Sequence, residues 1–189
     1  MKRIFDIIMA SFGLMVLSPL LAVLSILIII DSGLPVLYRQ NRVGRNNVDF
    51  LLWKFRSMHT DSDKKGLLTL GDHDPRITRM GYFLRKTKLD ELPQLFNVLS
   101  GDMSFVGPRP EVRKYVSHYT SEQMRVLSIR PGITDNASIR FRNEAEILSK
   151  QTDPEKYYLE KILPEKLDLY LKYVDDRTFL GDLKMILNT

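Results

Sequence analysis

The stretch from Ile7 to Ile30, IIMASFGLMVLSPLLAVLSILIII, contains no charged residue and decides the fold. Its length is sufficient for a membrane-crossing helix and exceeds the apolar core of a signal peptide. No small-residue cleavage motif follows it, so we expect the segment to be retained. The sequence therefore predicts a protein that is attached to a membrane through its N-terminal part.

Ser18 and Pro19 interrupt this stretch near its middle. Proline removes a backbone donor and bends a helix, and the Ser18 hydroxyl can bond to a carbonyl that the bend frees. Each arm then measures roughly 18 Å, well short of a hydrocarbon core about 30 Å thick. A re-entrant helix broken at Ser18-Pro19 is favoured over the alternative, a single span with a tolerated kink.

Positive residues flank the apolar stretch on both sides. Lys2 and Arg3 precede it, and Arg39, Arg42 and Arg45 follow it. Because positive residues near a membrane segment favour the cytoplasmic side, both ends are expected there. This places the protein on the cytoplasmic leaflet, with an anchor at residues 1–31 and a catalytic domain at 32–189 that forms one continuous unit with it.

The rest of the composition is that of one folded domain. The chain has 189 residues, 44% of them hydrophobic and 27% charged, which fits a globular unit with its own core. The absence of cysteine excludes disulfides, thiolate metal sites and thiol nucleophiles. A net charge of +5 does not choose among nucleic acid, anionic lipid and a phosphorylated substrate.

An α+β fold, mainly helical, is predicted beyond the anchor. Two short strands at 36–42 and 48–58, joined by a turn, form a β-hairpin, and a polar loop follows at 59–75. Helices are expected at 76–87, 90–99, 111–127, 142–149, 153–172 and 178–187, with an irregular loop over 101–110. The apolar face of the last helix is expected to pack on the core rather than on the membrane surface.

Two adjacent acids, Asp90 and Glu91, lie where a helix is expected to begin. Pro93 suits a first helical turn and Asp90 is a favoured N-cap, so the positive end of the helix dipole would keep these carboxylates ionised. Taken alone, the pair has a structural explanation, in which Asp90 caps the helix and Glu91 is solvated.

The basic residues around the acids favour a chemical role instead. Six of them crowd this part of the chain: Arg76, Arg79, Arg85, Lys86, Lys88 and Arg109. Arginine matches phosphate oxygens with a planar fork, and Mg²⁺ often uses one or two carboxylates together with substrate phosphates. Adjacent acids can divide into a nucleophile on phosphorus and a metal ligand, whereas a glycosidase needs two acids on opposite sides of a bond.

Gly107-Pro-Arg-Pro110 is a second candidate element. Pro108 and Pro110 fix the backbone around Arg109, which lowers the entropy cost of presenting its guanidinium to a phosphate. A rigid turn with an exposed arginine is an equal alternative for the motif by itself. A weaker third candidate is an anion-binding turn at residues 130–134. No P-loop or dinucleotide-binding glycine motif is present.

Together and in this order, these motifs closely resemble the bacterial sugar transferase family, the small monotopic phosphoglycosyl transferases. The matching segments are Ser18-Pro19, Lys54-Phe-Arg-Ser-Met58, Asp74-Pro-Arg-Ile-Thr78, Leu89-Asp-Glu-Leu-Pro-Gln94, Gly107-Pro-Arg-Pro110 and Pro131-Gly-Ile-Thr134. The resemblance covers nearly the whole chain. It implies a re-entrant anchor, an active site on the cytoplasmic face of the bacterial inner membrane, and Mg²⁺ as cofactor.

The resemblance also implies a two-step reaction. Asp90 would attack the sugar-bearing phosphate of a UDP-sugar and expel UMP, and undecaprenyl phosphate would then attack the phosphosugar-aspartyl intermediate. This is a first membrane step in making surface glycans such as exopolysaccharide or O-antigen. Glu91 would help to hold Mg²⁺, and Arg109 would bind phosphate. Further substrate-binding candidates are Arg76, Arg85, Arg142, Pro108 and Pro110.

The segment Asp135-Asn-Ala-Ser-Ile-Arg-Phe-Arg-Asn143 departs from the common family pattern. We expect it to influence which sugar is taken. The sequence names neither the sugar nor the oligomeric state, so a homodimer stays open, and it gives no indication of nucleic-acid binding. Two rival functions remain: a non-catalytic scaffold that holds lipid phosphate, and a phosphatase that forms an aspartyl intermediate.

Overall fold

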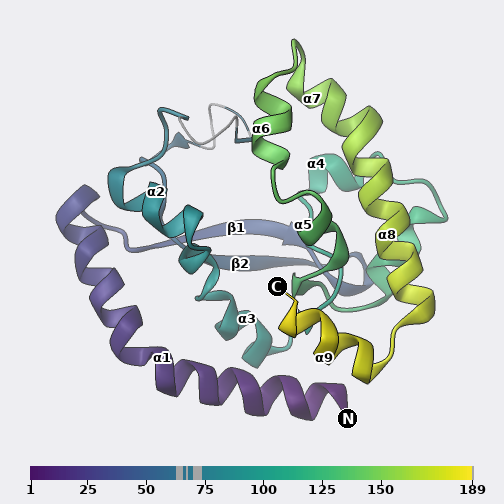
Figure 1. The fold of residues 1–189 in the computed structure, drawn as a ribbon, viewed down its shortest axis with the longest axis horizontal. Coiled ribbons are helices and arrows are strands. Elements are labelled where there is room, and N and C mark those ends of the chain that lie inside the picture. Colours follow the sequence, from purple (N-terminus) through teal and green to yellow (C-terminus); the bar gives the residue numbers. More distant parts are fainter. Residues whose placement is uncertain (63–65, 67, 70–73, 189) are drawn as a thin grey trace.

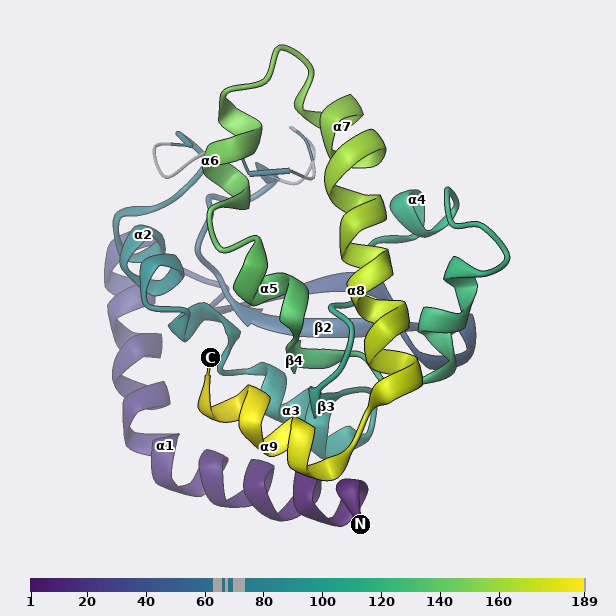
Figure 2. The same cartoon turned by 45° about the vertical axis from the view of Figure 1, so that its right-hand side comes forward.

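The computed structural model describes residues 1–62, 66, 68–69 and 74–188, and its fold is mainly helical, as predicted. Helix α1 (Lys2–Ser32) wraps around one side of the remaining domain (Figure 1). A β-hairpin, β1 (Leu37–Val43) and β2 (Asp49–Phe55), crosses the centre, and the C-terminal helices cover its other side (Figure 2). The predicted loop at 59–75 lies partly outside the described residues.

Helix α1 contains Pro19 and bends sharply near its middle (Figure 1). Ser18 Oγ donates to the Met15 carbonyl at 2.8 Å, the local bond expected of a serine beside a proline bend. By length and composition, the helix is apolar enough to cross a membrane. Most of its large side chains face outward, as shown by Met15 at 67% and Ile26 at 57% exposure.

Each arm of α1 buries a narrow stripe against the domain. Ala10 in the first arm packs with Leu95 and Val98 of α3 (Gln94–Ser100). In the second arm, Leu24 and Ile28 join a cluster that includes a residue of α2 (Arg79–Lys86). A buried leucine or isoleucine contributes about 1.5–3 kcal/mol, so these stripes hold both arms in place while the outer face stays apolar and open.

The hairpin is antiparallel with Leu37 opposite Phe55 and Val43 opposite Asp49, close to the predicted strands. Asn97 covers the outer edge of β2, because its amide donates to the Leu51 carbonyl at 2.7 Å and accepts from the Trp53 N–H at 3.0 Å. These bonds fix α3, and the acidic turn that precedes it, against the hairpin.

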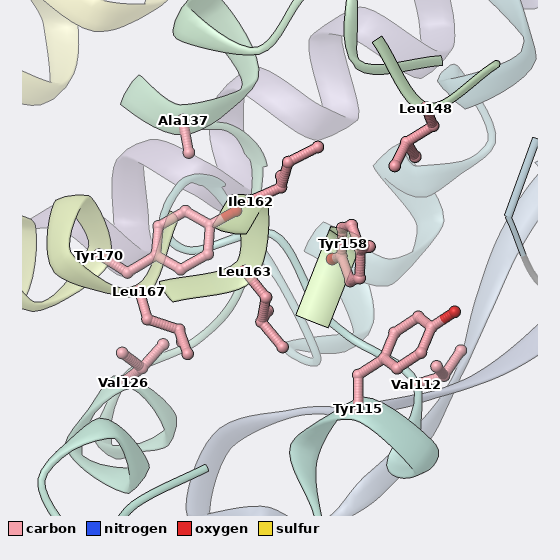
Figure 3. Packing of buried hydrophobic residues seen from close by; sticks show 10 residues of the cluster. All are labelled: Val112, Tyr115, Val126, Ala137, Leu148, Tyr158, Ile162, Leu163, Leu167 and Tyr170. Atoms are coloured by element: carbon pink, nitrogen blue, oxygen red, sulfur yellow. The ribbon is translucent and has the colours of Figure 1, made fainter. Parts of the chain in front are cut away.

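The C-terminal half forms a helical lobe around a separate core (Figure 3). Its elements are α4 (Arg113–Val116), α5 (Asn136–Arg140), α6 (Glu144–Ser149), α7 (Pro154–Tyr157) and α8 (Leu163–Asp176). A π-helical turn over Tyr158–Ile162 joins α7 to α8, so the helix predicted at 153–172 is confirmed as one continuous run. Tyr158, Ile162 and Leu167 are buried in this core.

Three predicted elements are wrong in detail. The helix expected at 111–127 is divided into α4 and a 3-10 helix at Gln123–Ser128. The irregular loop over 101–110 contains a short strand, β3 (Ser104–Val106). The last helix, α9 (Phe179–Leu187), does not bury its apolar face: Leu180 is 76% exposed, and the residue that is buried is Asp182. Helical periodicity cannot distinguish a core-facing stripe from a membrane-facing one.

Candidate functional site

The acid pair lies in a 3-10 turn, Leu89–Glu91, between α2 and α3. Lys88 precedes it with a left-handed φ of 59°, which turns the chain sharply after α2. The N-cap position of α3 is Pro93, so the prediction that Asp90 caps this helix is wrong. Both acids sit just before α3, and Asp90 is 6% exposed.

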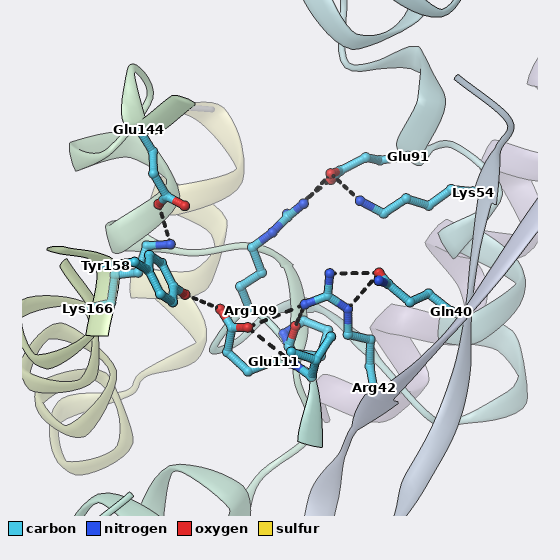
Figure 4. Close-up of polar contacts among 11 residues, drawn as sticks. Gln40, Arg42, Lys54, Glu91, Arg109, Glu111, Glu144, Tyr158 and Lys166 are labelled. Carbon is cyan, nitrogen blue, oxygen red and sulfur yellow. Dashed lines mark hydrogen bonds and ion pairs between the residues drawn. The ribbon is translucent and has the colours of Figure 1, made fainter. Parts of the chain in front are cut away.

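Glu91 is held by two cations (Figure 4). Arg109 approaches it with both terminal nitrogens, Nη1 at 3.2 Å from Oε2 and Nη2 in a short contact with Oε1, and Lys54 Nζ lies 3.2 Å from Oε1. Burial alone would raise the pKa of Glu91, but the charges and hydrogen bonds of Arg109 and Lys54 outweigh it and hold that pKa well below its usual range.

Asp90 has a different environment. Within the described part of the chain, its carboxylate accepts no hydrogen bond. Burial raises the pKa of Asp90, Lys54 opposes that rise, and the neighbouring Glu91 carboxylate reinforces it. The surroundings of the two adjacent acids thus shift their pKa values in opposite directions. Glu91 binds the cations of the protein, and Asp90 keeps a carboxylate available to a ligand.

Arg109 lies in a rigid backbone segment, residues 107–110, which together with the two short strands beside it forms what we call the bracket. Strand β3 pairs in parallel with β4 (Gly132–Thr134), which places the Gly132 N–H 3.0 Å from the Pro108 carbonyl. On the other side, Arg42 Nη1 donates to the Pro110 carbonyl at 3.0 Å. Both prolines that flank Arg109 are therefore fixed by their carbonyls as well as by their rings.

The segment at 130–134 supports this bracket instead of forming a free anion-binding turn. Arg130 Nε donates to the Gly101 carbonyl at 2.7 Å, and the Ser104 N–H donates to the Pro131 carbonyl at 2.9 Å. The predicted third anion site is therefore wrong, because the backbone groups of this segment are used in strand pairing.

A partly buried polar network, which the sequence did not reveal, lies behind Arg109. Arg42 binds the Gln40 amide oxygen with two nitrogens at 2.8 and 3.0 Å and also reaches Glu111 Oε2 at 3.4 Å. The Tyr158 hydroxyl donates to Glu111 Oε1 at 2.5 Å, which links the hairpin to the helical lobe (Figure 4). The sequence offers one signal: Arg42 is one of the basic residues that follow the apolar stretch, and Glu111 directly follows Gly107-Pro-Arg-Pro110.

The other predicted binding residues are placed unequally. Arg85 lies close enough to Asp90 to lower its pKa and lines the same cavity. Arg76 is engaged by Asp74, at 2.9 Å from Nε to Oδ1, and by loop carbonyls. Arg142 is exposed at the edge of the cavity. Substrate binding by these three residues stays a prediction.

A large open cavity of about 1390 Å³ joins these parts. It begins beside α1, where Phe12 and Leu17 line it, and passes the acid pair. It ends between the helices of the lobe. The described residues contain no cluster of three or more metal-binding side chains. Asp90 and Glu91 can supply only two carboxylates, a number that suits Mg²⁺ bound mainly through substrate phosphates.

Comparisons with known proteins identify the family of this chain. The model of the family described as bacterial sugar transferase matches residues 1–189. An Aeromonas hydrophila UDP-N-acetylgalactosamine-undecaprenyl-phosphate N-acetylgalactosaminephosphotransferase is 39% identical over 95% of this chain and 43% of its own length. The UDP-glucose:undecaprenyl-phosphate glucose-1-phosphate transferase of Escherichia coli is 35% identical over 100% of this chain and 39% of its own.

A shorter relative is also similar. An uncharacterized sugar transferase of Bacillus subtilis is 38% identical, and the match covers 98% of this chain and 83% of the relative. The chain thus spans less than half of the two longer enzymes and most of the shorter protein. With the family model matched from end to end, the chain belongs to the bacterial sugar transferase family.

Proposed function

We propose that this phosphoglycosyl transferase moves a sugar-1-phosphate from a UDP-sugar to undecaprenyl phosphate and releases UMP. The observation that supports this proposal most directly is the different pairing of the two acids. Glu91 is bound by Arg109, whereas Asp90 is open, and both line one cavity that reaches α1. The names of the relatives support the substrate class. The reaction would be an early membrane step in surface glycan assembly.

In the first step, an Asp90 oxygen attacks the phosphorus that bears the sugar. The bond from that phosphorus to the UMP oxygen breaks, and UMP leaves. In the second step, a phosphate oxygen of undecaprenyl phosphate attacks the same phosphorus, and the Asp90 carboxylate is regenerated. The basic groups Lys54, Arg85 and Arg109 offset the charge that moves among the oxygens.

The pairing of Glu91 with Arg109 suggests how the donor is received. Arg109 matches a phosphate as well as it matches a carboxylate, so an arriving diphosphate competes with Glu91 for the guanidinium. Transfer of Arg109 to phosphate would free Glu91 oxygens beside Asp90. Glu91 would then hold Mg²⁺ together with the donor phosphates, while Asp90 stays free to attack, and the ion would neutralise developing charge on phosphate oxygen.

We further propose a re-entrant anchor on the cytoplasmic face of the inner membrane, and the attachment of α1 supports the re-entrant geometry. Near its start, Arg3 Nη2 donates to the Leu99 carbonyl at 2.9 Å. Near its end, Asp31 accepts from the Met80 N–H at 3.0 Å. Because both ends are fastened to the same domain, they belong on the same side of the bilayer. Cysteines introduced near Met1 and near Asp31 should therefore be labelled from one side, and labelling from opposite sides would exclude re-entry.

The test of the reaction uses the full chain in nanodiscs with undecaprenyl phosphate, Mg²⁺ and a panel of UDP-sugars. Asp90→Asn should abolish UMP release and lipid-linked product, whereas Asp102→Asn, an exposed acid that accepts from Ser100 at 2.6 Å, should keep both. With wild type and labelled donor but no lipid acceptor, label should accumulate on the protein and be released by hydroxylamine. Robust turnover by Asp90→Asn would refute the nucleophile assignment.

The same assay separates the rival functions. A scaffold would release no UMP with any donor. A phosphatase would pass the phosphosugar to water, so its turnover would not depend on undecaprenyl phosphate. Dependence of multiple turnovers on the lipid acceptor is the result expected here.

A further inference from the structure

Glu144, which is partly buried, and Lys166, which is buried, form an ion pair on the wall of the cavity that belongs to the helical lobe. Lys166 comes from α8 and is 6% exposed, and Glu144 is the first residue of α6. The pair lies across from Glu91 and Lys54, with Arg109 between the two groups (Figure 4). Neither residue has a part in the phosphate chemistry proposed above.

The Lys166 ammonium has more hydrogen-bond donors than partners among the described residues. Among the described residues its contacts are one carboxylate, Glu144, and the face of the Tyr158 ring at 5.1 Å. An ammonium has three N–H donors, and a carboxylate can accept several hydrogen bonds. A buried ion pair is weak evidence for stability, since its desolvation cost often cancels its attraction. A pair that keeps donors and acceptors beside a cavity is better explained by a ligand.

The position of the pair indicates which part of the substrates it meets. The lipid acceptor must approach from α1, on the opposite side of the molecule from α6 and α8 (Figure 1). The donor's diphosphate belongs with Arg109 and the acids. The part of the donor that would reach the helical lobe, beside Glu144 and Lys166, is therefore an uncharged part. Adjacent charged acceptor and donor groups suit two neighbouring hydroxyls, each of which both donates and accepts.

We propose that Glu144 and Lys166 form the subsite that recognises ring hydroxyl groups of the donor sugar. This inference rests on the proposed function and adds the residues that select the sugar. It also places the atypical segment 135–143. Asp135 caps α5 by accepting from the Ser138 N–H at 2.7 Å, and α5 packs on α8 and leads into Glu144. The unusual residues there set the position of the pair.

The experiment measures UMP release with UDP-sugars that differ at single hydroxyls, including UDP-glucose against UDP-galactose and the two N-acetylhexosamine counterparts. Wild type should prefer one epimer. Lys166→Met and Glu144→Gln should each lower kcat/KM for that epimer about 10- to 100-fold and reduce the preference ratio at least about tenfold. The inhibition constant of UMP should stay within about twofold. Lys156→Met, which removes an exposed lysine of α7, should leave the ratio unchanged.

If a single variant fails to fold, the preference ratio can be measured with the double variant Glu144→Gln with Lys166→Met, which buries no unpaired charge. Glu144→Asp keeps both charges but withdraws the carboxylate, and it should also alter the ratio. An unchanged ratio in active variants, or a wild type without preference, overturns the assignment. Weaker UMP inhibition with an equal loss for all sugars overturns it in favour of uridine binding. A wild type that releases no UMP at all overturns the proposed function itself.

Discussion

Gly132→Ala is the substitution for which the structure gives the firmest estimate. A Cβ at Gly132 would lie 2.1 Å from the Gly107 nitrogen and 2.5 Å from its carbonyl oxygen. Both atoms are backbone, so no side chain can turn away. Ordinary contact begins near 3.4 Å, and the difference from 2.1 Å means that β3 and β4 must separate by about 1.3 Å.

Such a separation breaks the strand pairing. The bonds at risk are Ser104 N–H to Pro131 O at 2.9 Å, Gly132 N–H to Pro108 O at 3.0 Å and Gly107 N–H to Thr134 O at 3.2 Å. At about 1 kcal/mol each, their loss lowers the free energy of unfolding by about 3 kcal/mol. For a chain of this size that corresponds to a Tm decrease of about 6–12 °C.

Activity should fall as well, because the Gly132 N–H holds the backbone beside Arg109. A displacement of about 1 Å at a positioning group can cost about 100-fold in kcat/KM. The assays are thermal unfolding in detergent and UMP release in nanodiscs. Gly13→Ala is the matched control: its Cβ would meet one side-chain atom at 3.4 Å, and alanine favours the helix by about 0.5–1 kcal/mol. A Gly132→Ala protein with wild-type Tm and activity would refute the close-crossing argument.

Further predictions concern charge. Because Lys54 lowers the pKa of Asp90, Lys54→Met should move the acid limb of the kcat/KM profile to higher pH. Glu91→Gln removes a repulsion that raises this pKa, so it should move the acid limb to lower pH. Shifts of both variants in the same direction would contradict these assigned interactions. The raised pKa of Asp90 means that its ionised form opposes folding at neutral pH. Asp90→Asn should therefore raise Tm at pH 7, by about 2–4 °C per kcal/mol of relief, and the gain should vanish as pH falls below the ordinary aspartate range. Lys2→Met should lower Tm, since it leaves Asp182 buried without its cation, and the double variant with Asp182→Asn should recover part of the loss.

The features that follow from the sequence are those with a local cause. A charge-free run predicts α1, a proline within it predicts the bend, and a turn between two apolar runs predicts the hairpin. The basic residues that crowd the acid pair distinguish it in the sequence, and in the structure one of them, Arg109, pairs with Glu91. In each case the residues that matter are close together in the chain or carry a distinctive composition.

The features that the sequence did not reveal depend on distant contacts. Strands β3 and β4 have three residues each, too few for a periodic pattern, and they meet across an intervening helix α4. The resemblance divides the roles of Asp90 and Glu91, but the physical reason for that division depends on where Lys54 and Arg109 lie in space. The Glu144–Lys166 pair joins two helices whose facing sides cannot be read from composition.

Side chains at the start of α1 tie this helix to strand β3, which leads to Arg109. Lys2 Nζ donates to the Val106 carbonyl at 2.8 Å and pairs with Asp182 at 2.5 Å. Val106 ends β3 and directly precedes Gly107, so the start of the membrane helix holds the strand that presents Arg109. Asp6 of α1 also accepts from the Phe105 N–H of β3 at 3.3 Å, so a displacement of the start of α1 reaches the backbone beside Arg109 through two side chains. The first residues of α1 are thus fastened to the same strand that leads to Arg109.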